Sequence, residues 1–226
     1  MKKILVLAAV VLITDVANAQ TEYYMSAKLG GGNVTMYAQG DTKATDLLVQ
    51  TFNELDGAQY KYSNSSMLWN ASVALGVDWS LARMYVKKNP YDWFHVRLEG
   101  EFGYNNYREE GKLKDNYIVK HNLEMEIENF FILANGYADF QIDSFVPYIG
   151  LGLGYSFEKQ ELSVQDIDYN DYVDDSGMIY ALHAGAGYKY SDITTFDFGY
   201  RRVYSPTEGD GLNVFSSVRF GARFRI

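Results

Sequence analysis

The sequence predicts an all-β fold: an eight-stranded antiparallel up-and-down transmembrane β-barrel with a filled polar lumen. Three observations support this prediction. The chain opens with an export leader, the remainder alternates apolar and polar residues in eight segments, and aromatic residues are abundant. They make up 16% of the chain, which holds 20 tyrosines but only 3 prolines. Strands that end at a membrane interface need that combination.

The first 19 residues have the order of a secretory signal peptide. Lys2 and Lys3 precede an apolar run over residues 4–13, and the small-x-small sequence Ala17-Asn18-Ala19 follows. The run is about half of the ~20 residues that a membrane-spanning helix needs. We therefore expect residues 1–19 to be a cleaved signal peptide and residues 20–226 to be one outer-membrane β-barrel domain.

Charge and cysteine content exclude several classes of protein. The chain has no cysteine, so a disulfide framework cannot hold it together. Its formal net charge is −9, and loss of the leader, which carries one net positive charge, makes the mature chain −10. A nucleic-acid partner is not expected, because binding to phosphates needs a basic surface.

Alternation with period two is the main evidence for strands. In residues 94–104 the apolar parity includes Leu98 and Phe102, and the opposite parity carries Arg97, Glu99 and Glu101. A soluble β-sandwich also alternates, but its polar face meets bulk water and has no reason to interleave glycines with opposite charges. The eight segments are 23–37, 67–79, 94–104, 122–140, 147–158, 178–190, 195–204 and 212–226.

The segment 122–140 fits less well than the others. If Glu124, Glu126 and Glu128 point inward, the same parity places Phe130 and Ile132 inside as well. A β-bulge near Asn129 would repair the pattern.

The connections alternate between short and long, which predicts the orientation of the barrel. The short joins 141–146 and 191–194 are expected to be periplasmic turns. The joins 38–66, 105–121, 159–177 and 205–211 are expected to face outward. The join 81–91 is too long for a tight turn and is expected to form a hairpin below the membrane.

Four stretches carry a resemblance to a known family. They are residues 96–104 (VRLEGEFGY), 133–140 (LANGYADF), 147–155 (PYIGLGLGY) and 198–201 (FGYR). In this order and spacing they resemble the porin-like outer-membrane β-barrel family, which includes OmpA-type and opacity-type small surface barrels. The resemblance implies an outer-membrane location and a role such as adhesion or surface antigen.

The carboxyl end is similar to the terminal strand by which members of that family are recognised for membrane assembly. Phe220, Phe224 and Ile226 stand at the positions of the assembly signal. Such strands usually end in an aromatic residue, and here Ile226 occupies the last position.

The inward parity gathers a cluster of charged residues, which we expect to fill the lumen. Opposite charges in a narrow space should pair, and glycines on the same parity make room for their long side chains. The hairpin register further predicts that Asp197 lies opposite Arg219. The expected lumen charge cluster is Asp78, Arg97, Glu99, Glu101, Glu124, Lys189, Asp197, Arg201, Arg219 and Arg223.

No catalytic, cofactor or metal site is evident in the sequence. His95 and His183 fall on the lumen parity, where a lipid substrate cannot reach them, and no two histidines share ligand spacing on one strand. An acidic stretch between residues 166 and 175 departs from the calcium-loop pattern, because Asp171 stands where a glycine is needed. We expect a protein that is not an enzyme and needs no cofactor.

Two functions remain open at this stage. The first is a structural and surface-interaction role, adhesin-like or surface-antigen-like, carried by the extracellular loops. The alternative is a narrow porin that conducts ions or small solutes through the charged lumen. The expected partners are outer-membrane lipid and lipopolysaccharide, the outer-membrane assembly machinery and a host or surface ligand, for a protein that acts as a monomer.

Overall fold

The structure is a computed structural model that describes residues 21–37, 59–80, 93–114, 120–164, 169–207 and 211–226. The expected signal peptide, residues 1–19, lies outside the described residues, as does the expected hairpin at 81–91. Among the described residues, no helix has the length and apolar character needed to cross a membrane.

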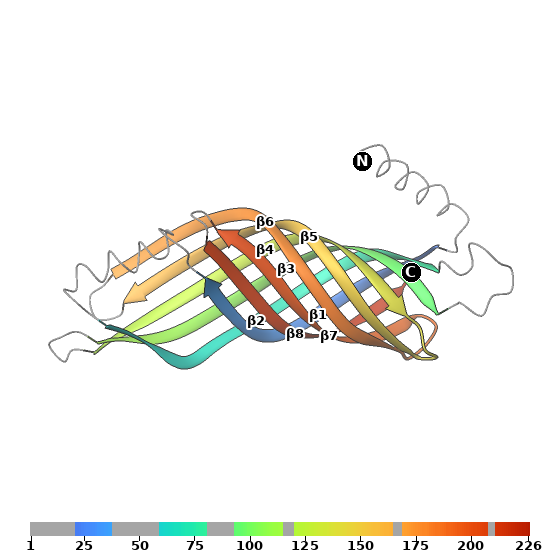
Figure 1. Cartoon of the computed structure of the whole chain (residues 1–226), viewed down its shortest axis with the longest axis horizontal. Coiled ribbons are helices and arrows are strands. Elements are labelled where there is room, and N and C mark those ends of the chain that lie inside the picture. Colours follow the sequence, from blue (N-terminus) through green and yellow to red (C-terminus); the bar gives the residue numbers. More distant parts are fainter. Residues whose placement is uncertain (1–20, 38–58, 81–92, 115–119, 165–168, 208–210) are drawn as a thin grey trace, which may run out of the picture.

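The described residues form eight strands that close into one antiparallel barrel, as the sequence predicts (Figure 1). Each strand pairs with its neighbours in the chain, and the first strand pairs with the last. Closure leaves no open edge around the ring, which stabilises a sheet that has no second layer. The strands are β1 (Thr21–Tyr37), β2 (Gln59–Ser80), β3 (Phe94–Lys114), β4 (Lys120–Phe140), β5 (Phe145–Val164), β6 (Tyr169–Lys189), β7 (Thr194–Thr207) and β8 (Gly211–Arg225).

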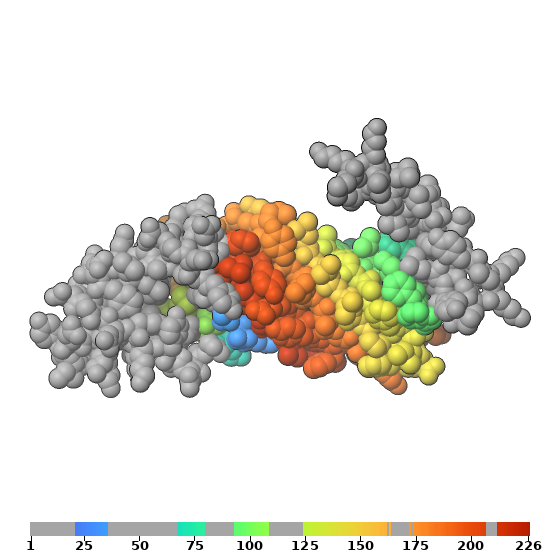
Figure 2. Space-filling view, viewed as in Figure 1, coloured from blue at the N-terminus to red at the C-terminus, as the bar shows by residue number. Residues whose placement is uncertain are grey.

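The outer face of the barrel is apolar, and much of its lumen is lined by polar and charged side chains, the reverse of a soluble protein. On β5, Ile149, Leu151, Leu153, Tyr155 and Phe157 are all exposed, while lumen-facing Ser156 is buried. This apolar run of nine residues matches the 9–11 that a tilted strand needs to cross the hydrocarbon core. In Figure 2 strands β5 to β8, coloured yellow to red, lie side by side as one continuous surface. The alternation therefore builds a transmembrane barrel with its outer face in lipid.

Strand β4 corrects one expectation. Its pairing with β3 and β5 runs without a register shift, so the predicted bulge near Asn129 is wrong. Odd-numbered residues face the lumen, and Phe130 and Ile132 point outward at 46% and 56% exposure. Phe130 and Ile132 belong to the lipid face. Glu124, Glu126 and Glu128 lie on the same face of the strand, nearer its amino end and beyond the apolar band. Within the membrane the outer face of β4 is apolar, and beyond the membrane the same face is charged.

Several strands are longer than expected, and the predicted long loops are correspondingly shorter. β3 ends at Lys114 and β4 begins at Lys120, so most of the predicted loop 105–121 is strand. β5 and β6 stay paired out to Val164 and Tyr169, whereas β6 pairs with β7 only from Tyr180 onward. The sheet of β2 to β6 therefore continues beyond β7 and β8 at this end of the barrel, which we call the loop end (Figure 1).

The opposite end, the turn end, carries the two short connections that the sequence predicts. Between β4 and β5, Ile142 forms a bridge with Phe145, and Asp143 has a φ of 54°. Asp tolerates this left-handed conformation better than most residues. Between β6 and β7, the amide of Tyr190 donates to the carbonyl of Thr194 at 3.0 Å. The carboxyl-terminal Ile226 lies at the same end, where its amide donates to the carbonyl of Tyr23 at 3.0 Å.

Candidate functional site

The lumen is the best-defined candidate site, and its turn-end half is filled by ionised side chains. Arg97 and Arg201 are each only 1% exposed, although both carry a full charge. Removing such groups from water is costly unless each is paired and hydrogen-bonded. The wall of the barrel supplies the partners from strands far apart in the sequence.

Glu101 on β3 is the centre of one group of contacts. Its carboxylate accepts a hydrogen bond from Arg219 on β8 at 2.6 Å and from Arg201 on β7 at 3.0 Å. The amide nitrogen of Asn135 donates to its other oxygen at 3.0 Å. Arg219 also donates to Ser72 on β2. The arginine contacts cross the lumen, so they tie together strands that do not pair in the sheet.

Glu99 on β3 is the centre of a second group. Its carboxylate forms an ion pair with Lys28 on β1. The hydroxyls of Tyr24 and Tyr137 donate to it at 3.1 and 3.3 Å. The side chains of Glu99 and Glu101 have no solvent exposure, so the shared Lys28, 3.9 Å from Glu101, helps to offset the repulsion between the two carboxylates.

Nearer the turn end, two arginines make two-pronged contacts. Arg97 donates from Nε and Nη2 to both oxygens of Asp139, at 2.9 and 3.1 Å. Arg223 donates in the same way to Asp197, at 2.7 and 3.0 Å. A 3.4 Å bond from Arg223 to Asp139 joins the two pairs. The parallel bonds fix the guanidinium planes as well as the charges. Arg97 is held further by the ring of Tyr137, 3.9 Å from its Cζ.

The pairing of Asp197 differs from the expectation. The predicted partner was Arg219, but β7 and β8 are shifted by two residues relative to the predicted register, so Asp197 lies opposite Gly221. Asp197 therefore bonds to Arg223, and Arg219 is left for Glu101. A shift of two keeps every side chain on its face of the sheet, so the lumen position of both residues is unaffected.

Two of the expected cluster residues lie at the turn-end rim. Asp78 contacts His95, with 3.0 Å between the carboxylate and Nδ1. Lys189 donates to the side chain of Gln141 at 2.6 Å. Both residues keep the inward parity, but they sit outside the central network.

Glu124 is the one expected cluster residue that does not face the lumen, so that placement is wrong. It lies on the outer face of β4 and forms an ion pair with Arg108 at 2.7 Å. Glu126 and Glu128 lie on the same face, where they accept hydrogen bonds from Asn106 and Tyr104. A polar outer face is possible here because this part of β4 lies beyond the apolar band.

Several residues of the network are absent from the cluster expected from the sequence, among them Lys28, Tyr137 and Asp139. Lys28 shares the inward parity of β1, but it was not included with the charged residues. Tyr137 and Asp139 lie beyond the expected bulge on β4, where the sequence pattern alone does not fix which residues point inward. The apolar Phe130 and Ile132 were the better signal, since only residues within the membrane report which face meets lipid.

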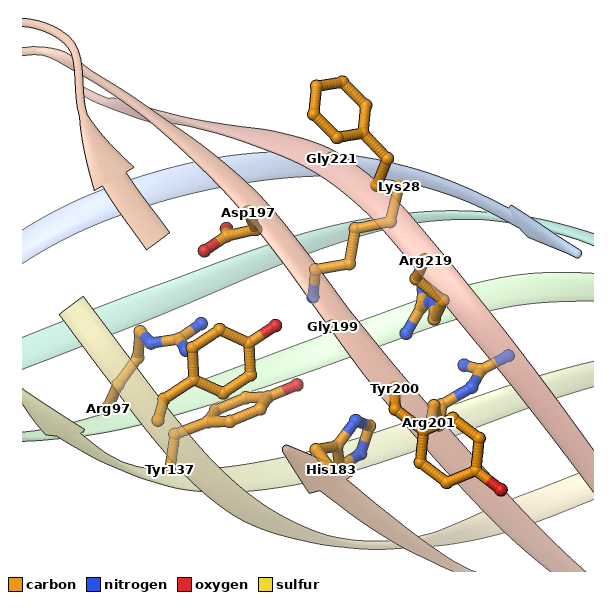
Figure 3. A pocket seen from close by; sticks show the side chains of 12 residues that line it. Lys28, Arg97, Tyr137, His183, Asp197, Gly199, Tyr200, Arg201, Arg219 and Gly221 are labelled. Atoms are coloured by element: carbon orange, nitrogen blue, oxygen red, sulfur yellow. The ribbon is translucent and has the colours of Figure 1, made fainter. Parts of the chain in front are cut away.

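The network leaves little free space. One cavity among its side chains has a volume of about 20 Å³, which is room for about one water molecule. Figure 3 shows Lys28 reaching into it between Asp197, His183 and Arg219. Gly199 and Gly221 line the same cavity. At Gly199 a Cβ would lie 2.4 Å from the hydroxyl of Tyr148, so the absent side chain makes room for the tyrosine.

Beyond the network, towards the loop end, the lumen is filled by apolar side chains that we call the apolar plug. Phe131 connects the two regions, because its ring lies 4.7 Å from the guanidinium of Arg201. It fits only because Gly103 has no side chain: a Cβ there would lie 2.2 Å from Cζ of Phe131. The plug consists of Leu68, Tyr107, Ile127, Phe131, Leu133, Ile179, Ala181, Val203 and Phe215.

A buried carboxylate with neutral partners lies beside the plug. Glu158 is 4% exposed and accepts hydrogen bonds from the amides of Asn129, Asn213 and Gln160 at 3.2, 2.7 and 2.6 Å. Asn105 connects this group to the ionic network, because it donates to Asn129 and accepts from Arg201. A chain of amides therefore runs from the guanidinium group of Arg201 to the carboxyl group of Glu158.

His95 and His183 point into the lumen and bond to its side chains. Nε2 of His183 lies 3.1 Å from the amide oxygen of Asn135, and the residue is 7% exposed. Among the described residues, no group of three His, Cys, Asp or Glu side chains could hold a metal ion. Asp174 and Asp175 of the acidic stretch are described and lie on opposite faces of β6, while Asp166 and Asp168 are outside the described residues.

The three residues of the expected assembly signal lie on the outer face at the turn end. Phe220, Phe224 and Ile226 are 60%, 43% and 71% exposed. β8 pairs with β1 along this stretch and closes the barrel. The strand that is expected to be recognised for assembly is thus also the strand that completes the ring.

Comparison with known proteins finds likeness at the level of fold. No protein-family model and no curated protein sequence matches the chain. Three solved structures illustrate the similarity. Neisserial surface protein A is 12% identical, with 90% of this chain and 97% of that one covered, at a TM-score of 0.42. The attachment invasion locus protein Ail of Yersinia pestis, solved with the heparin analogue sucrose octasulfate, is 15% identical. The match covers 91% of this chain and 99% of that one, at a TM-score of 0.44. The outer membrane protease OmpT from Escherichia coli is 9% identical. The match covers 90% of this chain and 97% of that one, at a TM-score of 0.42. These matches concern the barrel architecture alone.

Proposed function

We propose that this protein is an outer-membrane barrel that does not conduct, and that its function is to present the sheet and loops of the loop end at the cell surface. The observation that supports the proposal is the filled lumen. Side chains that are 1% exposed, such as Arg97, Arg201 and Phe131, leave no room for a hydrated ion to pass them. A small barrel of eight strands is wide enough to be filled by its own side chains.

The interaction surface is the sheet that extends past the membrane. β5 and β6 remain paired for several residues beyond Phe157, where the apolar band ends. A paired hairpin holds its side chains in place, so it can form a contact surface at a lower entropic cost than a flexible loop. The expected partner is a molecule on another cell or in the surrounding matrix, and the outer membrane supplies lipid and lipopolysaccharide around the barrel. The protein is proposed to act as a monomer and without catalysis.

Conductance tests the sealed lumen directly. Purified, refolded protein in planar lipid bilayers should give no steady currents, because the ionic network and the apolar plug obstruct the same path. Reproducible open-channel steps would overturn the proposal and restore the narrow porin.

The surface role needs a separate test. Glu161 to Val164 pair with Tyr169 to Tyr172 in register, so residues 161–172 can be replaced by Asn-Gly as a two-residue hairpin turn. The trimmed protein should keep its barrel and its resistance to detergent. Bacteria displaying the intact protein should adhere to epithelial cells or matrix-coated surfaces, and bacteria displaying the trimmed protein should not. Equal adhesion by the two would show that the extension is not the interaction surface.

A further inference from the structure

A groove on the outside of the barrel lies where the apolar band ends. It has a volume of about 400 Å³ and is lined by residues of β4, β5 and β6. Phe130 and Phe157 form its membrane side, are 46% and 54% exposed, and lie opposite each other in the sheet. The groove therefore sits at the level where acyl chains end and polar headgroups begin.

Beyond the two phenylalanines, on the side away from the membrane, a row of charged residues crosses the three strands. We call it the headgroup row: Glu128, Lys159 and Asp174. The three are direct neighbours in the strand register, so the row reads acid, base, acid across the sheet. All three line the groove. The row places one positive charge between two negative charges, immediately beyond the two phenylalanines.

Lys159 is available to a ligand. It is exposed, and no hydrogen bond or ion pair joins its ammonium group to another described residue, although carboxylates flank it on both sides. Glu128 accepts a bond from the hydroxyl of Tyr104 at 2.7 Å, which orients its carboxylate. An ordinary surface ion pair would join Lys159 to one of these carboxylates, whereas among the described residues its ammonium group has no such partner and can bind an anionic group.

The charges select among lipids. A phosphate fits the ammonium of Lys159, and a primary amine fits the carboxylate of Glu128 or Asp174. A headgroup with phosphates alone meets two carboxylates in the row and a third, Glu126, on the same face of β4. Like charges at this spacing repel, so a purely anionic headgroup is disfavoured.

We propose that the groove is a binding site for a phospholipid with a phosphoethanolamine headgroup. Its phosphate contacts Lys159, its ammonium contacts one of the flanking carboxylates, and its acyl chains cover Phe130 and Phe157. The site concerns the outer wall of the barrel, so it does not depend on the sealed lumen or on adhesion.

Native mass spectrometry of the delipidated, refolded full-length protein tests the site. Phosphatidylethanolamine should bind about tenfold more tightly than phosphatidylglycerol with the same acyl chains. Lys159→Ala should weaken phosphatidylethanolamine binding by about tenfold, the loss expected for one charge-assisted hydrogen bond. Glu128→Gln combined with Asp174→Asn should remove the preference over phosphatidylglycerol.

Arg108→Ala is the matched control. Arg108 is also an exposed cation on the outer face, but its charge is already paired with Glu124. This variant should bind phosphatidylethanolamine as the wild type does. A heat-dependent gel shift shows that each variant is folded, and the acid pair tests the site independently should Lys159→Ala fail to fold.

Three results would overturn the proposal. They are equal affinity for phosphatidylglycerol, an effect of Arg108→Ala as large as that of Lys159→Ala, and binding of soluble phosphoethanolamine as tight as that of the lipid. The trimmed hairpin described above retains the headgroup row, so it should lose adhesion but keep the lipid preference. Failure of one proposal can thus be told apart from failure of the other.

Discussion

Glu101→Gln is the most informative single substitution, because it removes one charge from the centre of the lumen without changing the size of the side chain. Glu101 has no exposed side-chain surface and accepts bonds from Arg201 at 3.0 Å and Arg219 at 2.6 Å. The amide would leave two buried guanidinium groups without their shared counter-ion. Breaking a buried ion pair from one side costs roughly 3–5 kcal/mol, and we expect the lower part of that range because a water-sized space lies nearby.

The chain provides a matched control in Glu124→Gln. Glu124 and Arg108 are 2.7 Å apart, almost the same distance as Glu101 and Arg219, but Arg108 is 54% exposed and Glu124 is 24% exposed. An exposed pair contributes about 0–1 kcal/mol. The two variants make the same chemical change in ion pairs of nearly equal length, so the difference between them measures burial.

The measurement is urea unfolding of each refolded variant in detergent micelles, followed by tryptophan fluorescence. The double variant Glu101→Gln with Arg219→Gln should cost less than the sum of the single changes, by about 0.5–3 kcal/mol, because it also removes one of the stranded cations. If Glu101→Gln and Glu124→Gln shifted the midpoint equally, the lumen would be as wet as the outer surface and the reasoning would fail.

Four further outcomes are expected. The folded protein should migrate differently before and after boiling, because a closed barrel resists detergent until it is heated, and unchanged migration would argue against closure. Leu98→Arg should cost roughly 2–4 kcal/mol in the same titration, since Leu98 is 47% exposed on the lipid face, and a harmless change would place it elsewhere. Asp197→Asn and Arg223→Gln should show coupling in a double-mutant cycle, while Asp197→Asn and Arg219→Gln should be nearly additive; the opposite result would restore the register expected from the sequence. Gly103→Ala should lower the urea midpoint because a buried aromatic ring occupies the space of the new methyl group, and a midpoint at the wild-type value would show that the ring can move.

The architecture could be predicted from the sequence because it depends on a local property. Successive side chains of a strand point to opposite faces, so Leu98 and Phe102 share one environment and Arg97 and Glu99 share the other wherever the strand lies. Eight such segments and the two short connections were enough to predict the closed barrel and to place every residue of the expected charge cluster except Glu124 on the lumen side.

The same rule gave a wrong placement for Glu124, because its physical basis holds only inside the membrane. Alternation identifies a lipid face only inside the membrane, and β4 continues beyond it. Glu124 therefore sits on the outer face of β4, beyond the lipid-facing Phe130, without contradiction. The lengths of the strands decide where that boundary falls, and they depend on cross-strand pairing at the loop end.

The sequence by itself determined which face of a strand each residue occupies, whereas the partners across the lumen were decided by the tertiary structure. A shift of two residues between β7 and β8 preserves every face yet moves Asp197 from Arg219 to Arg223. Glu101 meets Arg201 only because closure brings β3 opposite β7, 100 residues further along the chain. Parity is fixed by the covalent geometry of the strand, but register and closure are set by the packing of the whole ring.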